Sequence, residues 1–334
     1  MKALVYTAPR EVTYRDEPEP LLAEGEVVLR IDAVGICGSD MHAWHGHDPR
    51  RNPPLILGHE LSGTVVAGPG TGRRYTANPL ITCGTCEYCV AGRNNLCSNR
   101  TMVGMTRPGA FAQRMSIPVS SLVGIPADMT ARQAALTEPA ATSVHALHLA
   151  SRALVRPLAE STAVVIGGGA IGLLMALLLR ASGCRSVWLA ETNALRRDAA
   201  ARAADCRTWN PLETDGPGAN AADLVVDAVG ATATRKTALA TVKPGGVVVH
   251  IGLQDWASEI DMRKLTLAEI TLIGTYTYST ADLRATVRAL HAGAFGDLAW
   301  VEERALADGA AAFRDIHEGR AAAAKIVLRP EHAA

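Results

Sequence analysis

A glycine-rich turn between an apolar strand and an apolar helix constrains the fold of this chain more than any other feature. Residues 163–166 are typical of a buried strand and residues 171–181 of a buried helix. The turn between them has the spacing G-x-G-x-x-G, with Gly167, Gly169 and Gly172. The first glycine permits a tight turn, the second lets the backbone approach a pyrophosphate, and the third lets helix and strand pack closely. This context predicts a dinucleotide-binding turn.

The cofactor is expected at the N-terminus of that helix, where Ala170 and Ile171 begin the first turn and unpaired N–H groups favour phosphate. Glu191 ends the next strand, about twenty residues further on, where a carboxylate binds the adenosine ribose hydroxyls. A carboxylate there repels the 2′-phosphate of NADP, so the sequence favours NAD. Arg196 and Arg197 follow closely, either as phosphate ligands or as part of a solvated helix face.

The pattern around the turn predicts a two-domain α/β protein. Alternating strands and helices continue at 187–190, 194–204, 224–228, 247–251 and 270–276. Repeated alternation of this kind builds a doubly wound parallel sheet, a Rossmann domain. The first part of the chain has short strands separated by turns, most clearly at 27–33, 61–66 and 110–116.

The predicted domain limits follow from these patterns and from the length of 334 residues. The sequence predicts a first domain over 1–147, a nucleotide-binding domain over 148–279, and a C-terminal segment, 280–334, that returns to the first domain. That segment closes with an expected strand at 325–328, after an alanine run at 321–324 that fits a helix.

Four cysteines within one short lobe, residues 83–97, predict a metal site. They are Cys83, Cys86, Cys89 and Cys97, in the pattern C-x2-C-x2-C-x7-C. Four thiolates fill the tetrahedral shell of one zinc ion and leave no position for a substrate, so this zinc is structural. A disulfide pair or free thiols are the alternatives.

Composition excludes several classes of function. Formal net charge is zero, which argues against nucleic acid or an anionic membrane as a partner. The longest apolar run, 170–179, is too short to span a bilayer, and the N-terminus lacks a secretory h-region. Seven cysteines, an odd number, fit a reducing compartment, so we expect a cytoplasmic protein without membrane contact.

Two further short segments contain zinc-ligand chemistry outside the lobe. Cys37 stands in one, and His59 with Glu60 in the other. A catalytic zinc takes three protein ligands and keeps one position open. No short spacing shows that these residues meet, and a single cysteine or histidine is also common in a core or on a surface.

Together these segments resemble the zinc-containing medium-chain alcohol dehydrogenases, and most of all their polyol branch (sorbitol, butanediol and threonine dehydrogenases). The similarity covers essentially the whole chain. The motifs that carry it are 35–40, 58–60, 83–89, Glu138-Pro139, the nucleotide glycines and 319–328. The resemblance implies a chaperonin-10-like (GroES-like) β-barrel catalytic domain beside the Rossmann domain, and a homodimer or homotetramer in which residues 270–276 could pair across subunits.

The resemblance also implies the catalytic zinc ligands. Cys37 and His59 bind the metal, while Glu60 and Glu138 bind it directly or through water. Ethanol-type enzymes have a cysteine at the place of Glu138. Carboxylates in place of a thiolate make the site harder and suit a substrate with two vicinal oxygens. Each chain would then hold a catalytic and a structural zinc ion.

The implied reaction is oxidation of a secondary alcohol or polyol to a ketone. Zinc lowers the pKa of the bound alcohol, so that an alkoxide forms and transfers hydride to the nicotinamide. Ser39 and His42 match the proton relay of the family. Ile251, Leu253 and Thr275 lie at strand ends, where their backbone can contact the nicotinamide.

One segment departs from the family pattern, and two alternative functions remain. Residues 67–75 form a shorter loop than usual before the four-cysteine lobe and lack a Gly-Asp-Arg-Val turn. The family pattern therefore does not predict the shape of the approach to the substrate site. The alternatives are an NADP-linked aldehyde or ketone reductase of the same fold and a non-catalytic nucleotide-binding scaffold.

Overall fold

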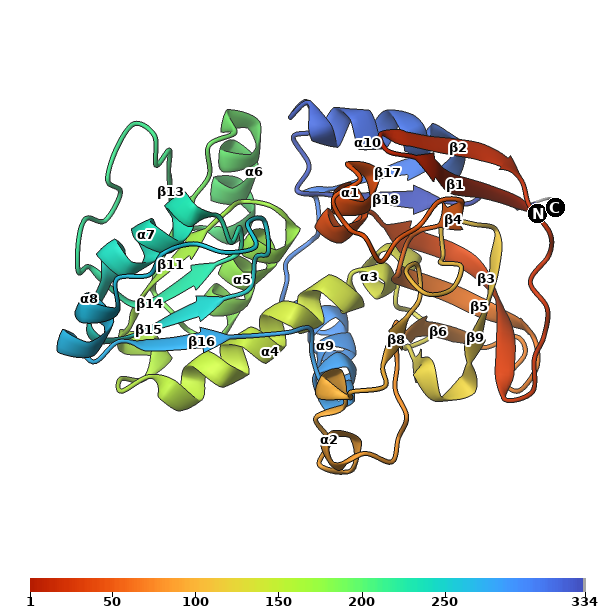
Figure 1. The fold of residues 1–334 in the computed structure, drawn as a ribbon, viewed down its shortest axis with the longest axis horizontal. Coiled ribbons are helices and arrows are strands. Elements are labelled where there is room, and N and C mark those ends of the chain that lie inside the picture. Colours follow the sequence, from red (N-terminus) through yellow and green to blue (C-terminus); the bar gives the residue numbers. More distant parts are fainter. Residues whose placement is uncertain (333–334) are drawn as a thin grey trace.

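The computed structural model describes residues 1–332. A parallel sheet with helices on both faces forms one part, and mainly antiparallel strands form the other (Figure 1). Helix α4 (Thr137–Ala153) runs from one part to the other. Within the described chain, no helix is long and apolar enough to cross a bilayer.

The parallel sheet has six strands in the order of a doubly wound fold. In spatial order they are β13 (Arg207–Trp209), β12 (Ser186–Ala190), β11 (Thr162–Ile166), β14 (Ala222–Asp227), β15 (Val242–His250) and β16 (Thr271–Gly274). The chain order reverses between β11 and β14, which is where such sheets bind ligands. The predicted Rossmann sheet is therefore confirmed.

Helices cover both faces of this sheet, which explains why its strands are continuously apolar. The helices on one face are α4, α5 (Ala170–Ala181), α6 (Ala194–Ala204) and α9 (Thr280–His291). On the other face lie α7 (Thr232–Thr241) and α8 (Met262–Leu267). A strand buried on both faces cannot alternate with polar residues, so its sequence is a short apolar run.

The other part is built around a seven-stranded sheet. Its strands are β10 (Leu122–Gly124), β6 (Arg74–Ala77), β5 (Glu60–Ala67), β3 (Glu26–Gly35), β18 (Lys325–Arg329) and β17 (Val301–Ala305), with β9 (Arg114–Pro118) on β3. Smaller sheets contain β2 (Glu11–Asp16), β1 (Lys2–Ala8) and β4 (Leu55–Ile56), and then β7 (Leu80–Ile81) and β8 (Thr101–Met102). Short helices are α1 (Gly38–Trp44), α2 (Glu87–Val90), α3 (Ala131–Ala135) and α10 (Gly309–His317). Because β18 pairs with β3, the end of the chain completes the sheet that its beginning starts.

Two expectations about local structure were wrong. Residues 110–113 are not in a strand, because Ala110 and Phe111 donate hydrogen bonds to Gly58 and Leu57 outside the ladder, and β9 starts only at Arg114. The alanine run at 321–324 is not helical but leads directly into β18. The short 67–75 loop closes a hairpin between β5 and β6, which pair antiparallel.

The carboxylate of Asp282 joins α9 to α4. Asp282 lies 2.8 Å from the Nδ1 atoms of both His145 and His148 and accepts from the hydroxyl of Ser279. Burial opposes ionisation, but these bonds hold the pKa of Asp282 well below its usual range. A depressed carboxyl pKa stabilises the fold above about pH 4, and this stabilisation is lost as the pH falls further.

Asp282→Asn is therefore expected to lower the free energy of unfolding at pH 7 by about 2 kcal/mol. The difference from the wild type should shrink below about pH 4, as measured by urea unfolding across pH. Asp128→Asn is the matched control, because Asp128 contacts His291 at the surface, with 78% of its side chain exposed. An equal loss in both variants would show that burial does not matter for this contact.

Candidate metal centres and nucleotide site

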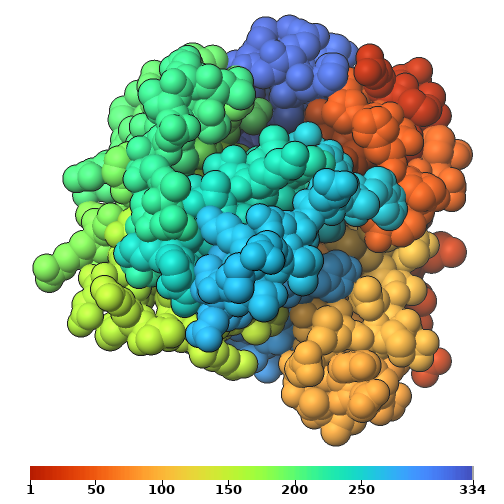
Figure 2. Space-filling view, turned by 60° about the vertical axis from the view of Figure 1, so that its left-hand side comes forward, coloured from red at the N-terminus to blue at the C-terminus, as the bar shows by residue number. Residues whose placement is uncertain are grey.

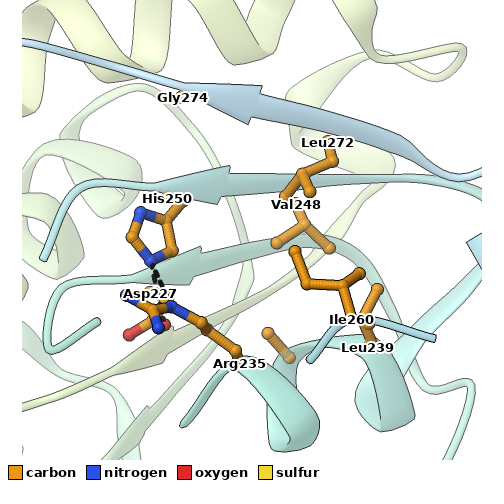
Figure 3. A pocket seen from close by; sticks show the side chains of 9 residues that line it. Asp227, Arg235, Leu239, Val248, His250, Ile260, Leu272 and Gly274 are labelled. Atoms are coloured by element: carbon orange, nitrogen blue, oxygen red, sulfur yellow. Dashed lines mark hydrogen bonds and ion pairs between the residues drawn. The ribbon is translucent and has the colours of Figure 1, made fainter. Parts of the chain in front are cut away.

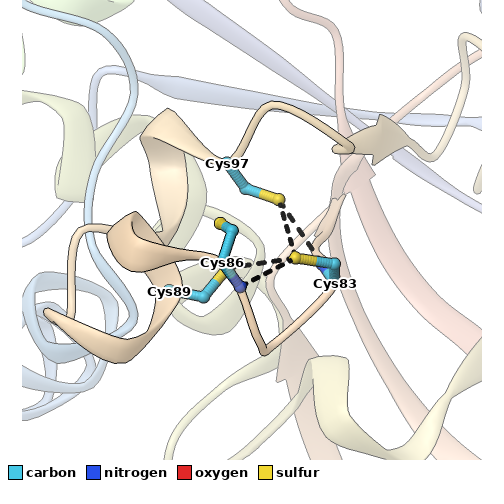
Figure 4. Close-up of side chains that lie close together, drawn as sticks. All are labelled: Cys83, Cys86, Cys89 and Cys97. Carbon is cyan, nitrogen blue, oxygen red and sulfur yellow. Dashed lines mark hydrogen bonds between the residues drawn. The ribbon is translucent and has the colours of Figure 1, made fainter.

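The four cysteine thiols of the lobe point toward one another (Figure 4). Cys83 and Cys97 have their sulfurs 3.5 Å apart, and Cys83 and Cys89 have theirs 4.0 Å apart. These distances exclude a disulfide, whose S–S bond is about 2.05 Å. Sulfurs that surround one zinc ion at about 2.3 Å are expected roughly 3.8 Å apart, and one of the two distances is slightly shorter and the other slightly longer than this value.

The local backbone supports a thiolate at this site. Burial raises the pKa of Cys89 to about 11, but the backbone N–H groups of Thr85 and Cys86 lower the pKa of Cys83 to about 6, and the Cys86 nitrogen lies 3.3 Å from the Cys83 sulfur. A thiol with such a pKa is ionised near neutral pH, as a zinc ligand must be. The donor set and its spacing thus fit the structural zinc that the sequence predicts.

A second group of ligand atoms converges where α1 meets the start of β5. The ligand atoms of Cys37, His59 and Glu60 all lie within 4.8 Å of one another. Cys37 is the N-cap of α1, and the two other residues follow Gly58, which has a φ of +91° and packs against Phe111. The fold therefore brings together residues more than twenty positions apart, and this mixed donor set fits a catalytic zinc.

Asp40 lies behind the histidine of this cluster. Its Oδ1 atom is 3.5 Å from Nδ1 of His59, and both side chains are buried. Neither atom has a hydrogen-bond partner within the described chain. Burial opposes the charge on Asp40, yet His59 and Arg51 lower its pKa. The buried carboxylate thus lies just beyond hydrogen-bond geometry, in the place from which carboxylates orient metal-bound histidine rings.

Lys325 is a residue of this site that the sequence analysis missed. Its ammonium group donates to both carboxylate oxygens of Glu60, at 2.7 and 2.6 Å, and to the Ile36 carbonyl at 2.8 Å. Glu60 and Lys325 are 1% and 3% exposed. The buried carboxylate next to His59 thus has its own counter-charge on the last strand.

Tyr278 is a second residue of this site that the sequence analysis did not predict. Its hydroxyl donates a 2.7 Å hydrogen bond to Oε1 of Glu138, near the start of α4, and the tyrosine is fully buried. Burial raises the pKa of Glu138, and the charges of His59 and Glu60 act on it too. Glu138 thus lies close to the cluster but is held by a residue from the link between β16 and α9.

Ser39 and His42, the predicted relay residues, lie on α1 directly after Cys37. Arg51, only 2% exposed, donates to the Ser39 hydroxyl at 3.2 Å and to the Ser39 carbonyl at 3.1 Å. Burial lowers the pKa of His42, and the nearby His47 lowers it further. The imidazole of His42 is therefore neutral near pH 7 and able to accept a proton.

The glycine turn has the backbone geometry that the sequence predicts. Gly167 has a φ of +101°, and Gly169 is the N-cap of α5, which Ala170 begins. At Gly172 a Cβ atom would collide with the carbonyl oxygen of Gly167. At Gly169 nothing lies within 4 Å of such an atom, so space remains above the helix N-terminus.

Glu191 lies directly against this turn. Its Oε2 accepts from Gly168 at 2.8 Å and its Oε1 from the backbone of Asn193 at 2.8 Å. A side chain at Gly168 would meet the Glu191 carboxylate at 2.9 Å, a role for this glycine that the motif alone does not show. The carboxylate is 9% exposed and stands at the end of β12, as predicted.

The remaining predicted cofactor residues lie around the same edge of the sheet. Arg196 is in the first turn of α6, and its Nε atom is buried without a partner in the described chain. Ile251 follows β15, and Thr275 follows β16 with a buried, unbonded hydroxyl. Leu253 is 73% exposed, so it does not contribute to the core.

A separate cavity of about 270 Å³ lies between α7 and the last strands of the parallel sheet (Figure 3). Its wall is mostly apolar, from Leu239, Val248, Ile260 and Leu272. Arg235 closes one end through a 3.0 Å hydrogen bond to His250. The cavity contains none of the predicted ligands or relay residues, and it opens beside the edge strand β16.

Comparisons with known proteins agree with this geometry. Residues 23–127 match the model of the alcohol dehydrogenase GroES-like domain, and residues 170–292 match that of the zinc-binding dehydrogenases. The first match confirms the predicted barrel. L-galactonate-5-dehydrogenase of Escherichia coli is 30% identical, over 88% of each chain.

Two solved structures extend the similarity over nearly the whole chain. A zinc-binding dehydrogenase family structure from Sinorhizobium meliloti, bound to NADP, is 30% identical with a TM-score of 0.86, covering 98% and 99% of the chains. Acetophenone reductase of Geotrichum candidum, in complex with NAD, is 29% identical with a TM-score of 0.86, covering 98% and 96%.

Proposed function

The chain belongs to the zinc-containing medium-chain dehydrogenases, enzymes that act on CH–OH groups with NAD(P), and from this premise we propose that it oxidises a secondary alcohol or polyol with NAD. The observation that carries the proposal is the convergence of Cys37, His59 and Glu60 beside a buried Glu138. One thiolate, one imidazole and carboxylate oxygens form a harder donor set than two thiolates, and such a set favours oxygen-rich substrates. Because the members of this family are enzymes, the non-catalytic scaffold is no longer an alternative.

The protein's own groups would orient the substrate and remove its proton. Zinc bound by Cys37 and His59, with Glu60 and Glu138 directly or through water, would supply Lewis acidity. As the hydroxyl of Ser39, which Arg51 orients, accepts the proton of the substrate hydroxyl, it would release its own proton along the relay toward His42. His42 would then carry the proton toward solvent, because it is neutral near pH 7.

The substrate class follows from the donor set, and a matched pair of compounds tests it. We infer a polyol or hydroxy acid with two vicinal oxygens, and L-galactonate-5-dehydrogenase is one relative whose name fits this class. A vicinal diol should exceed its analogue without the second hydroxyl by about tenfold or more in kcat/KM, because a polar site binds poorly to a compound that leaves its groups unpaired. Equal rates on both compounds would contradict the vicinal-oxygen preference.

NAD is the proposed cofactor because the nearly buried Glu191 directly follows β12, where a carboxylate binds the adenosine ribose hydroxyls. The NADP-linked reductase remains the alternative, and one related structure was solved with NADP. The backbone contacts of Glu191 to Gly168 and Asn193 fix the carboxylate in place.

Glu191→Ser should therefore lower the preference for NAD over NADP by about tenfold or more, since charged hydrogen bonds contribute about 1.5–3 kcal/mol. The measurement is kcat/KM with each cofactor at saturating substrate. Arg196→Gln is the control for the opposite effect, because loss of this cation would weaken binding of the 2′-phosphate, which NADP carries and NAD lacks. An unchanged ratio in Glu191→Ser would remove this residue from cofactor selection.

A homo-oligomer is also proposed, as a dimer or tetramer. Strand β16 is the last strand of the parallel sheet, and Leu272 on it is 39% exposed. An unpaired edge strand is a template for pairing with another chain, here a second copy. Light scattering gives the mass directly, and a monomer at micromolar concentration would contradict this. The domain limits at residues 147 and 279 and the cytoplasmic location stay predictions.

A further inference from the structure

The link between β16 and α9 carries the tyrosine that holds Glu138. It contains Thr277, with a φ of +45°, in the left-handed region that residues other than glycine rarely adopt. A strained residue of this kind persists only where its surroundings hold it. Tyr278 follows directly and reaches the Glu138 carboxylate from this strained position.

Two asparagines of the four-cysteine lobe hold this link. Asn95 Nδ2 donates to the Tyr276 carbonyl at 2.8 Å, and Asn94 Oδ1 accepts from the Thr280 backbone N–H at 3.0 Å. The bonds lie on either side of Tyr278. Both asparagines are buried, at 9% for Asn94 and 3% for Asn95, so water does not readily replace these contacts.

The lobe metal would fix these asparagines. Asn94 and Asn95 form the short 3-10 helix η1 (Asn94–Leu96), which lies between Cys89 and Cys97 in sequence. The Cys97 N–H donates to the Asn94 carbonyl at 3.1 Å, and Cys97 is fully buried. In Figure 2 the lobe, in orange, stands out from the body of the molecule at the lower right.

We propose that the four-cysteine lobe is a positioning element for the reaction centre, which acts through Asn95 and Tyr278 on the carboxylate of Glu138. The chain of contacts runs from the lobe to the link, and from the link to Glu138 at the start of α4. The lobe therefore does more than stabilise its own loop. The inference rests on the proposed function, because it assigns the lobe a role at the proposed catalytic zinc.

The test uses one chemical change at two neighbouring residues. Asn95→Asp replaces the donating amide by a carboxylate that repels the Tyr276 carbonyl, whereas Asn94→Asp keeps the oxygen that accepts from Thr280. Both variants add the same charge in the same turn. We expect Asn95→Asp to lower kcat/KM and the affinity of the catalytic site for a metal ion by about 10- to 100-fold, as for other contacts behind metal ligands. Asn94→Asp is expected to remain near wild type in both.

The affinity of the catalytic site is measured with Co²⁺, by its visible absorption, in protein whose lobe retains zinc. This measurement needs no substrate, so it separates failure of this inference from failure of the proposed alcohol oxidation. Asn99→Ala is a further control, since Asn99 is an exposed residue of the same region. It is expected to match the wild type in both measurements.

The decisive test is a double-mutant cycle that combines Asn95→Asp with Tyr278→Phe. If the lobe acts through Tyr278, the effects of Asn95→Asp and Tyr278→Phe do not add, and the double variant resembles Tyr278→Phe alone. Fully additive effects, or equal loss in Asn95→Asp and Asn94→Asp, would overturn the proposal. Should Asn95→Asp not fold, Asn95→Ala replaces it in the same cycle, with the same two outcomes.

Discussion

In protein without the catalytic zinc, replacing Lys325 with methionine is expected to lower the free energy of unfolding by about 3–5 kcal/mol, because it leaves the Glu60 carboxylate buried without a counter-charge. The two side chains make the shortest buried ion pair of the site, with both carboxylate oxygens bonded to one ammonium group. Lys325 also holds the Ile36 carbonyl, so three acceptors lose their donor at once. Urea unfolding at pH 7 measures the loss.

The controls for this prediction separate the buried pair from lysine in general. Lys2→Met removes a similar contact to Asp16, but that pair is exposed, and no measurable change is expected. The double variant Glu60→Gln/Lys325→Met removes both charges and should recover most of the stability. A loss in Lys325→Met no larger than in Lys2→Met would mean that the Glu60 carboxylate finds water or another partner.

Replacing Cys37 with serine is expected to lower turnover by about 10³-fold or more, since Lewis acidity contributes several kcal/mol of barrier lowering and each 1.36 kcal/mol is a factor of ten. Zinc content should fall from about two ions per chain to about one, because the four-cysteine lobe is separate from this ligand. Turnover and metal content are measured on the same preparation.

Cys206→Ser is the matched control for this substitution. Cys206 lies half-buried between α6 and β13, with its thiol 3.8 Å from the Ala200 carbonyl, and it belongs to neither metal cluster. Turnover and zinc content should stay at the wild-type level. If Cys37→Ser kept its activity while losing one zinc, the reaction centre would have to lie elsewhere.

Features set by short segments could be predicted from the sequence. The glycine turn from Gly167 to Gly172 depends on backbone conformation within six residues, and the four-cysteine lobe on one loop. In both motifs the spacing of residues along the chain determines the local geometry. The parallel sheet with helices on both faces followed from the alternation of strands and helices, whereas the order of its strands comes from the structure.

Features set by contacts between distant segments could not be predicted. Lys325 is 265 positions from Glu60, and Tyr278 is 140 positions from Glu138. Tyr278 lies in no motif, and Lys325 lies in the closing 319–328 segment, where a lysine in a strand looks like an ordinary surface residue. Only the pairing of β18 with β3 brings the lysine into the core.

The local errors have a similar cause. The alanine run before β18 has high helix propensity, but it follows Gly319, which has a φ of +69°, and Ala321 is buried. Tertiary packing overrides propensity in so short a segment. Residues 110–112 form a short apolar run like that of a buried strand, yet the backbone of Phe111 bonds to Leu57 and Leu4 outside a regular ladder.

The most direct test of the central claim is NADH formation from a panel of secondary alcohols, vicinal polyols and sugar acids, before and after a chelator removes the catalytic zinc. We predict activity on at least one vicinal substrate with NAD, its loss when about one zinc per chain has gone, and its return when zinc is added back. NADH formation that survives loss of that zinc, or activity with NADP alone, would contradict the account.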